Sequence, residues 1–471
     1  MNVPFVLKSL LAAVSLASAM PEDSLTFGPF GKVHVYKGSP TPRRVALFVS
    51  GDGGWNLGVV DMAKSLAGSD TWILGVDIRT YFSHIGAAHG ACAYAAADFE
   101  GLSHFAQKRL GLKDYIVPAL VGYSSGATLV YGVLAQAPRG TFAGAVSLGF
   151  CNDLDIAKPL CKGDGLTWEP REKGKTGTNL LPTKTLSEPW IALQGMQDET
   201  CLPNATKAFV DQVPKGELVL LPKVGHGYSV ERNWMPQFLD AFAKLAPSTP
   251  APVPAKEKSI SVGPNVSDLP LVEVPAAGGS DTRLAILLTG DGGWAGIDRD
   301  IAGSLAAKGI SVVGWNSLKY FWERKSEKTA SSDLARVIAH YRQAWKKDNV
   351  ILVGYSLGAD ALPAMAAGLP AEVLAKVESI GLVGLESTYD LEFHITDWVP
   401  GEADGKLVLP LLRKLKGRSI VCVYGKEEKG SLCPQLEAGL AKVVELPGGH
   451  HMGGDYAKLA EILSGSNAKA P

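Results

Sequence analysis

The feature that most constrains the fold is an internal duplication. The segment VALFVSGDGGW at residues 45–55 recurs as LAILLTGDGGW at 284–294, and LVGYSSGA at 120–127 recurs as LVGYSLGA at 352–359. The copies lie a whole domain apart, far beyond the roughly 20–50-residue period of a solenoid. Alternating prolines between the halves are typical of an extended linker. We therefore predict two homologous domains, at residues 21–245 and 259–466, joined by a proline-rich linker at 246–258.

Length and composition fit two globular domains. The chain has 471 residues, of which 46% are hydrophobic and 20% are charged, an ordinary balance for a soluble domain. Lys and Arg together number 46 and Asp and Glu 47, for a formal net charge of −1. A nucleic-acid-binding protein normally needs a basic excess to contact phosphates, so no nucleic-acid binding is expected.

Short apolar runs alternate with segments of helical periodicity in both halves. The runs lie at residues 45–49, 72–76, 115–121, 144–148, 190–193 and 217–221, and again at 284–288, 310–313, 349–353, 379–383, 419–424 and 442–446. Continuous apolar strands separated by helices indicate a parallel sheet that is covered on both faces. The predicted fold class is therefore α/β, with each half a mostly parallel, doubly wound sheet with helices on both faces.

The first residues have the pattern of an export signal. Lys8 precedes a short apolar run at residues 10–16, and Ala17-Ser18-Ala19 is a small-residue cleavage site. The run is too short to span a bilayer, so residues 1–19 are predicted to be a cleavable signal peptide.

Six cysteines follow the predicted signal peptide: Cys92, Cys151, Cys161, Cys201, Cys422 and Cys433. An even number in an exported chain favours disulfides. Cys151–Cys161 and Cys422–Cys433 are the nearest pairs, but spacing alone leaves the connectivity open. No Cys/His cluster has zinc-ligand spacing, and neither a metal nor a cofactor is expected.

Two Gly-x-Ser-x-Gly motifs carry the strongest chemical signal. They lie at residues 122–126 and 354–358, each after a predicted strand and before an Ala-rich helix. This is the context of a nucleophile elbow, in which a sharp turn exposes a serine hydroxyl at the start of a helix. Recurrence at equivalent places makes chance matches improbable. Ser124 and Ser356 are therefore the candidate nucleophiles.

A serine nucleophile needs a base and an acid that orients it. In the nucleophile-elbow fold, the acid and then the histidine follow the serine along the chain. In the first half, Asp198 comes directly after an apolar run and His226 follows the last run. Ser124, Asp198 and His226 thus form a complete, correctly ordered set.

The second half leaves two choices open. Counting from the shared glycine of the acid loop aligns Glu428 with Asp198, and Glu427 is the alternative. The residues that follow the histidine align His450 with His226, whereas counting from the preceding Leu-Pro pair selects His451. We favour Glu428 and His450.

Acyl transfer also requires hydrogen-bond donors aimed at the developing oxyanion. One candidate is the backbone N–H after the nucleophile, at Ser125 or Leu357. The other is in the Gly-Asp-Gly-Gly loop, where Asp52 and Asp291 would contribute N–H groups. The carboxylate of each Asp either contacts a cationic substrate group or caps its own turn.

These motifs, the segment SLKYFW at residues 317–322 and the ending GGHH at 448–451 resemble the AcvB/VirJ family of bacterial virulence proteins. The resemblance covers essentially the whole mature chain. It implies two tandem α/β-hydrolase domains, the second of them VirJ-like, and a periplasmic location. It also implies hydrolysis of aminoacylated phosphatidylglycerol, chiefly lysyl-phosphatidylglycerol, at the membrane surface, and a link to virulence and to proteins of type IV secretion.

A lysyl ester would need acidic neighbours in the second half. The candidates are Asp291 and the acidic residues Glu386, Asp390, Glu392 and Asp397, for which a solvated surface is the alternative. The aromatic candidates for the pocket rim are Trp294, Tyr320, Phe321 and Trp322, for which core packing is the alternative. Two other functions fit the same sequence: a general carboxylesterase or lipase, and a non-catalytic periplasmic scaffold for secretion machinery.

Overall fold

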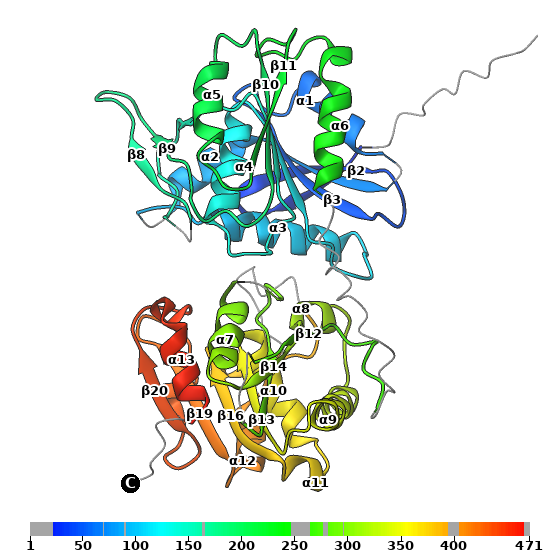
Figure 1. The fold of residues 1–471 in the computed structure, drawn as a ribbon, viewed down its shortest axis with the longest axis vertical. Coiled ribbons are helices and arrows are strands. Elements are labelled where there is room, and N and C mark those ends of the chain that lie inside the picture. Colours follow the sequence, from blue (N-terminus) through cyan, green and yellow to red (C-terminus); the bar gives the residue numbers. More distant parts are fainter. Residues whose placement is uncertain are drawn as a thin grey trace, which may run out of the picture.

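The computed structural model describes residues 22–68, 70–88, 91–162, 165–245, 264–276, 281–294, 296–393 and 405–465. The predicted signal peptide, the predicted linker and Asp397 lie outside these residues. The described chain forms two lobes, each built around its own sheet (Figure 1). We call residues 22–245 the first lobe and residues 264–465 the second lobe. No described helix is long and apolar enough to cross a membrane.

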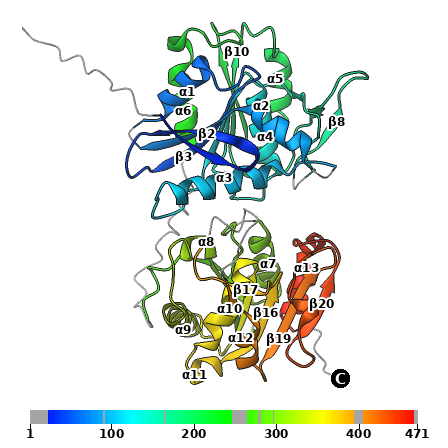
Figure 2. The same cartoon turned by 180° about the vertical axis from the view of Figure 1, so that it is seen from behind.

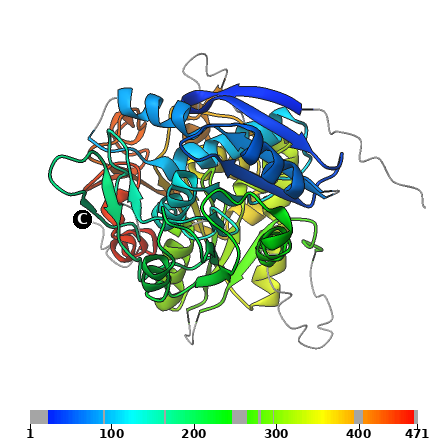
Figure 3. The same ribbon diagram turned by 90° about the horizontal axis from the view of Figure 1, so that it is seen from above.

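The first lobe contains an eight-stranded sheet in the order β1-β2-β4-β3-β5-β6-β10-β11. Its strands are β1 Glu22–Phe27, β2 Gly31–Lys37, β3 Arg44–Val49, β4 Thr71–Val76, β5 Ala119–Tyr123, β6 Ala145–Leu148, β10 Trp190–Gly195 and β11 Gly216–Leu221. The six strands β4, β3, β5, β6, β10 and β11 run parallel to their neighbours. They are formed by the apolar runs of the sequence. The edge strands β1 and β2 are antiparallel and were not expected; they lie in dark blue at the border of the lobe (Figure 3).

The second lobe repeats this architecture with seven strands in the order β12-β14-β13-β15-β16-β19-β20. They are β12 Leu271–Val274, β13 Arg283–Leu288, β14 Ser311–Trp315, β15 Asn349–Tyr355, β16 Val377–Val383, β19 Ser419–Gly425 and β20 Lys442–Leu446. Only β12 runs antiparallel to its neighbour in this sheet. Two small antiparallel sheets complete the described strands: β7 Asp153–Leu154, β8 Trp168–Pro170 and β9 Thr178–Leu180, and β17 Thr388–Tyr389 with β18 Lys406–Leu407.

Helices cover both faces of each sheet (Figures 1 and 2). In the first lobe they are α1 Leu57–Leu66, α2 Ile78–Ala87, α3 Ala95–Arg109, α4 Ser125–Gln136, α5 Pro203–Val210 and α6 Met235–Lys244. In the second lobe they are α7 Gly296–Ala307, α8 Ser317–Tyr320, α9 Glu327–Ala344, α10 Leu357–Ala367, α11 Ala371–Leu374, α12 Leu409–Lys414 and α13 Tyr456–Leu463. α1 and α6 pack on one face of the first sheet, as α7 and α13 do in the second. The predicted fold class is confirmed.

The strands read as continuous apolar runs because both faces of each sheet are buried. Along β3, Val45, Leu47 and Val49 join one hydrophobic cluster, whereas Ala46 and Phe48 join another on the opposite face. Successive side chains of a strand point to opposite faces, so a strand buried on both sides has no polar position to alternate.

The strand order places one crevice at the carboxyl edge of each sheet. From β3 the chain builds outward to β4 on one side and then returns to build β5, β6, β10 and β11 on the other. β13 occupies the equivalent place in the second sheet. Ligands of doubly wound folds bind where the strand order reverses in this way. The glycine-rich loop after β3 and the elbow after β5 both begin at that point.

All six cysteines form disulfides: Cys92–Cys161, Cys151–Cys201 and Cys422–Cys433. The neighbouring pair in the second lobe is therefore bonded, whereas Cys151 bonds to Cys201 and not to Cys161. Cys151 follows β6 and Cys201 follows β10, and these strands are adjacent in the sheet. Three disulfides are typical of proteins exported to an oxidising compartment.

Trp190 is the residue whose loss we expect to destabilise the first lobe most. Its ring is fully buried and lies 4.5 Å from Tyr131 and 5.0 Å from Phe150, centroid to centroid. Replacing Trp190 by alanine removes these contacts and leaves a cavity, so we expect the free energy of unfolding to fall by about 3–5 kcal/mol. Urea unfolding followed by circular dichroism measures it. The exposed Leu220 is the control, because Leu220→Ala should change stability by less than about 0.5 kcal/mol; equal effects would contradict the prediction.

Candidate active site

Both candidate nucleophiles sit in the strained turn that the motif predicts. Ser124 lies between β5 and α4 with φ 55° and ψ −124°, and Ser356 lies between β15 and α10 with φ 51° and ψ −122°. A non-glycine residue rarely adopts a positive φ, and such strain clusters at functional sites. The two turns share one geometry, so each serine starts a helix at the carboxyl edge of its sheet.

The glycines of the motif are required by close packing of the backbone. A Cβ atom on Gly126 would lie 2.4 Å from the carbonyl oxygen of Ser50, and one on Gly358 would lie 2.3 Å from that of Leu288. Any larger residue would therefore push the helix start away from the neighbouring strand end. This contact sets the elbow against the glycine-rich loop.

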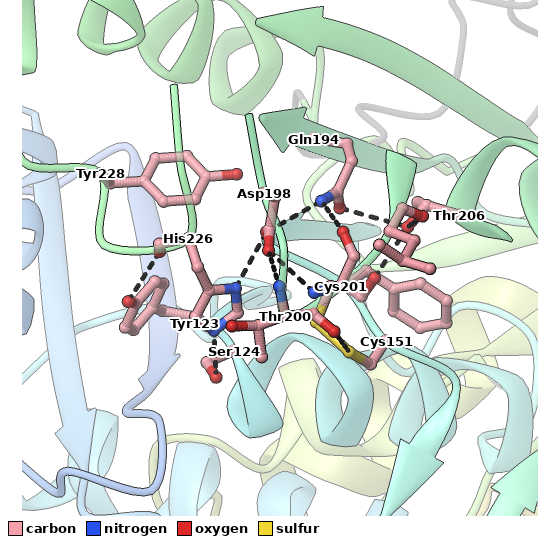
Figure 4. Close-up of polar contacts among 12 residues, drawn as sticks. Tyr123, Ser124, Cys151, Gln194, Asp198, Thr200, Cys201, Thr206, His226 and Tyr228 are labelled. Atoms are coloured by element: carbon pink, nitrogen blue, oxygen red, sulfur yellow. Dashed lines mark hydrogen bonds and ion pairs between the residues drawn. A yellow bond between two sulfur atoms is a disulfide. The ribbon is translucent and has the colours of Figure 1, made fainter. Parts of the chain in front are cut away.

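In the first lobe, serine, histidine and acid converge (Figure 4). The Ser124 hydroxyl lies 2.9 Å from Nε2 of His226, and Nδ1 of the same ring lies 2.9 Å from Oδ2 of Asp198. The Tyr123 hydroxyl donates to the backbone carbonyl of His226 at 2.9 Å, which fixes the loop that carries the imidazole. This is the hydrogen-bonded geometry of a Ser-His-Asp triad.

The buried Asp198 carboxylate is held from several sides. Its Oδ1 accepts the backbone N–H groups of Thr200 and Cys201 at 2.9 and 2.8 Å, and its Oδ2 accepts from the Gln194 amide at 2.9 Å. The Cys151–Cys201 disulfide anchors the same loop (Figure 4). These contacts fix the acid that orients His226. No role was predicted for Gln194, although a polar residue at the end of a buried apolar run was a signal that could have found it.

In the second lobe the structure brings together Glu428 and His450. Nδ1 of His450 lies 2.5 Å from Oε1 of Glu428, and the other carboxylate oxygen accepts the backbone N–H of Gly425 at 3.1 Å. Glu427 and His451 are both exposed. The geometry therefore favours Glu428 and His450 over Glu427 and His451.

The backbone after the histidine supports the same alignment. Tyr228 and Met452, each two residues after its histidine, adopt the same unusual positive φ of 47° and 50°. Both side chains are buried. Because two strained positions coincide only when His226 is aligned with His450, the two imidazoles hold equivalent places.

One contact differs between the lobes. Among the described residues, the Ser356 hydroxyl makes no hydrogen bond to His450 or to His451, whereas Ser124 is bonded to His226. In the described part of the second lobe, the acid and the histidine are therefore hydrogen-bonded to each other, whereas the serine is not hydrogen-bonded to the histidine. Hydrogen bonds of this kind are often long in ligand-free enzymes and shorten when substrate binds.

The charge of His450 is set by the acids around it. Burial alone would lower the pKa of the imidazole, but the hydrogen bond and charge of Glu428, with the charges of Asp291 and Glu386, raise it above 6.5. For Glu428, burial would raise the pKa, but the hydrogen bonds from His450 and from the Gly425 N–H lower it. The pair is therefore arranged as a carboxylate that stabilises an imidazolium.

Each glycine-rich loop, which carries one of the predicted oxyanion donors, lies beside its candidate nucleophile. A Cβ atom on Gly51 would lie 2.9 Å from the Ser124 Cβ, and one on Gly290 would lie 3.4 Å from the Ser356 Cβ, so each glycine-rich loop packs against its nucleophile. Ser125 and Leu357 are the first residues of α4 and α10. Their N–H groups have no acceptor within the helix and are free to face a bound carbonyl.

The two loop aspartates differ in their surroundings. Asp52 is exposed and Asp291 is partly buried. Burial raises the pKa of Asp291, and nearby His450 and the N–H groups of Asp291 and Gly292 partly offset this rise. The Asp291 carboxylate is thus stabilised by the backbone of its own turn and lies within electrostatic range of the histidine, so the two roles considered from the sequence are compatible.

Two positions beside the nucleophile are neutral in the first lobe and acidic in the second. Four residues after the serine, Thr128 donates to the carbonyl of Cys151 at 2.7 Å. At the same place, Asp360 accepts the backbone N–H of Glu386 at 2.7 Å. Asp360 was missed in the sequence, although comparing the two repeats four residues after each serine would have found it.

The two aromatic residues predicted to bind substrate do not line the site. Tyr320 is buried and its hydroxyl donates to Asp333 at 2.6 Å. Trp322 is buried between the lobes, where its indole N–H donates to the carbonyl of Leu112 at 2.7 Å. Phe321 is fully buried as well. Tyr320 and Phe321 pack in the core of the second lobe. Trp322 packs against Tyr115 of the first lobe, a contact that the sequence of the second half does not show.

The acidic stretch is divided between two roles. Glu392 pairs with Arg324 at 2.8 Å and with Lys108 of the first lobe at 3.3 Å, and Asp390 lies 3.9 Å from Arg324. These acids are neutralised by ion pairs at the surface and between the lobes. Glu386 remains exposed beside the site, within electrostatic range of His450.

The arrangement identifies the class of protein. A doubly wound parallel sheet, a strained serine elbow and an acid and histidine on later loops define the α/β-hydrolase fold. The chain belongs to the bacterial virulence protein (VirJ) family, which it matches over residues 43–146 and 282–469, more than half of its length.

Solved structures with low sequence identity also resemble the chain. An esterase domain of a Rhodothermus marinus protein is 16% identical, with 48% of this chain and 98% of that chain covered and a TM-score of 0.33. An α/β serine hydrolase homologue from Coxiella burnetii is 18% identical, with 48% and 98% covered and a TM-score of 0.32. Esterase LipW from Mycobacterium marinum is 19% identical, with 48% and 81% covered and a TM-score of 0.34. No curated protein matches the chain.

Proposed function

We propose that the protein is a serine ester hydrolase that cleaves the aminoacyl ester of aminoacylated phosphatidylglycerol, chiefly lysyl-phosphatidylglycerol. Its products would be the free amino acid and phosphatidylglycerol. The second lobe carries this reaction, with Ser356 as nucleophile, His450 as base and Glu428 as the orienting acid. The three disulfides and the predicted export signal support a periplasmic site of action at the membrane surface, where proteins of a secretion system are the proposed partners.

The observation that carries the proposal is a pair of acidic residues beside the second nucleophile that has no counterpart in the first lobe. Asp360 and Glu386 stand where the first lobe has Thr128 and Cys151. Burial raises the pKa of Asp360 well above its usual range, and the charges of Glu386, Glu428 and Asp291 add to this. Carboxyl groups this close together resist ionising at once. A cation bound among them would relieve the repulsion, and a lysyl group brings two ammonium ions to its ester.

The geometry supports the usual order of steps. With Nδ1 of His450 hydrogen-bonded to Glu428, Nε2 is the nitrogen left to take the Ser356 proton. The serine oxygen attacks the ester carbonyl, and the N–H groups of Leu357 and Asp291 stabilise the oxyanion. The imidazolium gives its proton to the departing glycerol oxygen, which releases phosphatidylglycerol. Water, deprotonated by His450, then hydrolyses the aminoacyl-serine and restores the enzyme.

The closed triad of the first lobe supports a second, independent activity. Ser124, His226 and Asp198 are joined by hydrogen bonds of 2.9 Å without any substrate. The two positions that are acidic in the second lobe are neutral in the first, at Thr128 and Cys151, so we propose that the first lobe acts on uncharged acyl esters.

Lysine release tests the proposed substrate. Phosphatidylcholine vesicles containing lysyl-phosphatidylglycerol are mixed with the mature protein carrying Ser124→Ala, which removes the activity proposed for the first lobe, and free lysine is measured by mass spectrometry. We expect kcat/KM for the lysyl lipid to exceed that for a neutral short-chain ester by about two orders of magnitude, because an ion pair to the ester group is present only in the lipid. Equal rates would instead indicate a general carboxylesterase. No turnover of either ester would favour a non-catalytic scaffold.

A further inference from the structure

The first lobe covers the glycine-rich loop of the second lobe, residues 290–293, from one side. A Cβ atom on Gly296 would lie 2.7 Å from the Cβ of Pro138, and one on Gly140 would lie 3.6 Å from the carbonyl oxygen of Trp294. The turn after α4 therefore packs on the chain that directly follows residues 290–293. Figures 1 and 2 show the first lobe over this end of the second sheet.

Helix α3 contacts the second lobe through one stripe of its surface. Lys108 pairs with Glu392 at 3.3 Å, and the His104 ring lies 5.3 Å from that of Phe393. Residues four apart share one face of a helix, and Glu100 comes four residues before His104. Glu100 therefore extends the stripe that faces the second lobe.

The Glu100 carboxyl lies on this face of α3, within electrostatic range of the Asp291 carboxyl. Burial and the charge of Asp291 raise the pKa of Glu100 to about 8. Within the described part of the chain, no lysine or arginine pairs with either carboxyl group. Asp52, the equivalent of Asp291, is exposed in the first lobe. The second site thus has two neighbouring carboxyl groups, one from each lobe, and a bound ammonium group would favour their ionised forms.

We propose that Glu100 completes the substrate site of the second lobe and binds the side-chain ammonium of the lysyl group. This inference rests on the proposed function. Asp291, in the glycine-rich loop beside the nucleophile, would meet the α-ammonium, whereas Glu100, from the other lobe, would meet the longer end of the substrate. The first lobe would then act as a specificity element for the second.

The test compares two lipids that differ only in the side-chain cation. Glu100→Gln keeps the size of the side chain and removes its ability to ionise when a cation binds. We expect kcat/KM for lysyl-phosphatidylglycerol to fall about tenfold and that for alanyl-phosphatidylglycerol to change less than about twofold, because the alanyl lipid lacks the second ammonium. Glu392→Gln, which removes another carboxylate between the lobes, is the matched control and should leave the ratio of the two rates unchanged.

A second measurement separates this inference from the proposed function. In a Ser356→Ala background, binding to vesicles containing either lipid is measured by flotation, with and without Glu100→Gln. If Glu100→Gln weakens binding to the lysyl lipid but not to the alanyl lipid, the role of Glu100 is supported even if turnover is absent. An unchanged ratio of rates and of binding, or an equal loss for both lipids, would overturn it. If Ser356→Ala still releases lysine, the proposed function fails instead.

Discussion

Ser356→Ala is expected to lower lysine release from lysyl-phosphatidylglycerol by at least about a thousandfold, because removing a triad nucleophile leaves only binding and oxyanion stabilisation. Ser356 holds the strained elbow conformation, with φ 51°, which an alanine would keep. The loss should therefore appear in kcat while the melting temperature stays within a few degrees. Lysine release and thermal unfolding measured on the same preparation check both statements.

Two serine controls assign the activity to its lobe. Ser332→Ala alters an exposed hydroxyl on α9 and should leave lysine release unchanged. Ser124→Ala removes the nucleophile of the closed triad, and we expect it to lower turnover of a neutral ester but not of the lysyl lipid. Lysine release that depended on Ser124 and not on Ser356 would contradict our assignment of the reaction to the second lobe.

Glu428→Gln should reduce kcat by about 10³- to 10⁴-fold, the effect seen when the acid of a serine triad becomes an amide. The Glu428 carboxylate accepts from Nδ1 of His450 at 2.5 Å, so an amide in its place favours the wrong tautomer. Glu427→Gln is the matched control, because the Glu427 side chain is exposed and Nδ1 of His450 is hydrogen-bonded to Glu428 instead. Equal losses in both variants would show that the loop and not the carboxylate matters.

The pH dependence of kcat/KM gives a second readout for Glu428. His450 must be neutral to accept the serine proton, and the surrounding carboxylates raise its pKa above 6.5. Activity should therefore fall as the solution is acidified, with a midpoint above 6.5. Without the Glu428 charge the imidazole loses protons more easily, so the residual activity of Glu428→Gln should have its midpoint at lower pH. A midpoint that did not move would contradict the assigned pair.

The sequence revealed the parts of the fold that depend on local patterns. Buried strands such as 45–49 and 284–288 are continuous apolar runs, and they became β3 and β13. The edge strands β1 and β12 were not foreseen because they are partly exposed and mix polar with apolar residues. An edge strand packs on fewer neighbours, so its sequence carries a weaker signal.

Cysteine pairing and aromatic roles could not be read in the same way. Cys151 is ten residues from Cys161 in the sequence but bonds to Cys201, which follows the adjacent strand. Trp322 has the same local sequence whether it lines a pocket or packs against another lobe. Its burial follows from Leu112 and Phe393, which lie far from it in the chain.

By itself, the sequence determined the duplication, the doubly wound α/β class and the two serine elbows, because periodic burial and a tight glycine turn are written in neighbouring residues. The tertiary structure alone decided that His450 and not His451 meets Glu428, that Asp360 stands beside Glu386, and that α3 of the first lobe packs against the second lobe. Such contacts depend on distances between side chains that are remote in the chain, and these distances are set only when both sheets and both lobes have packed.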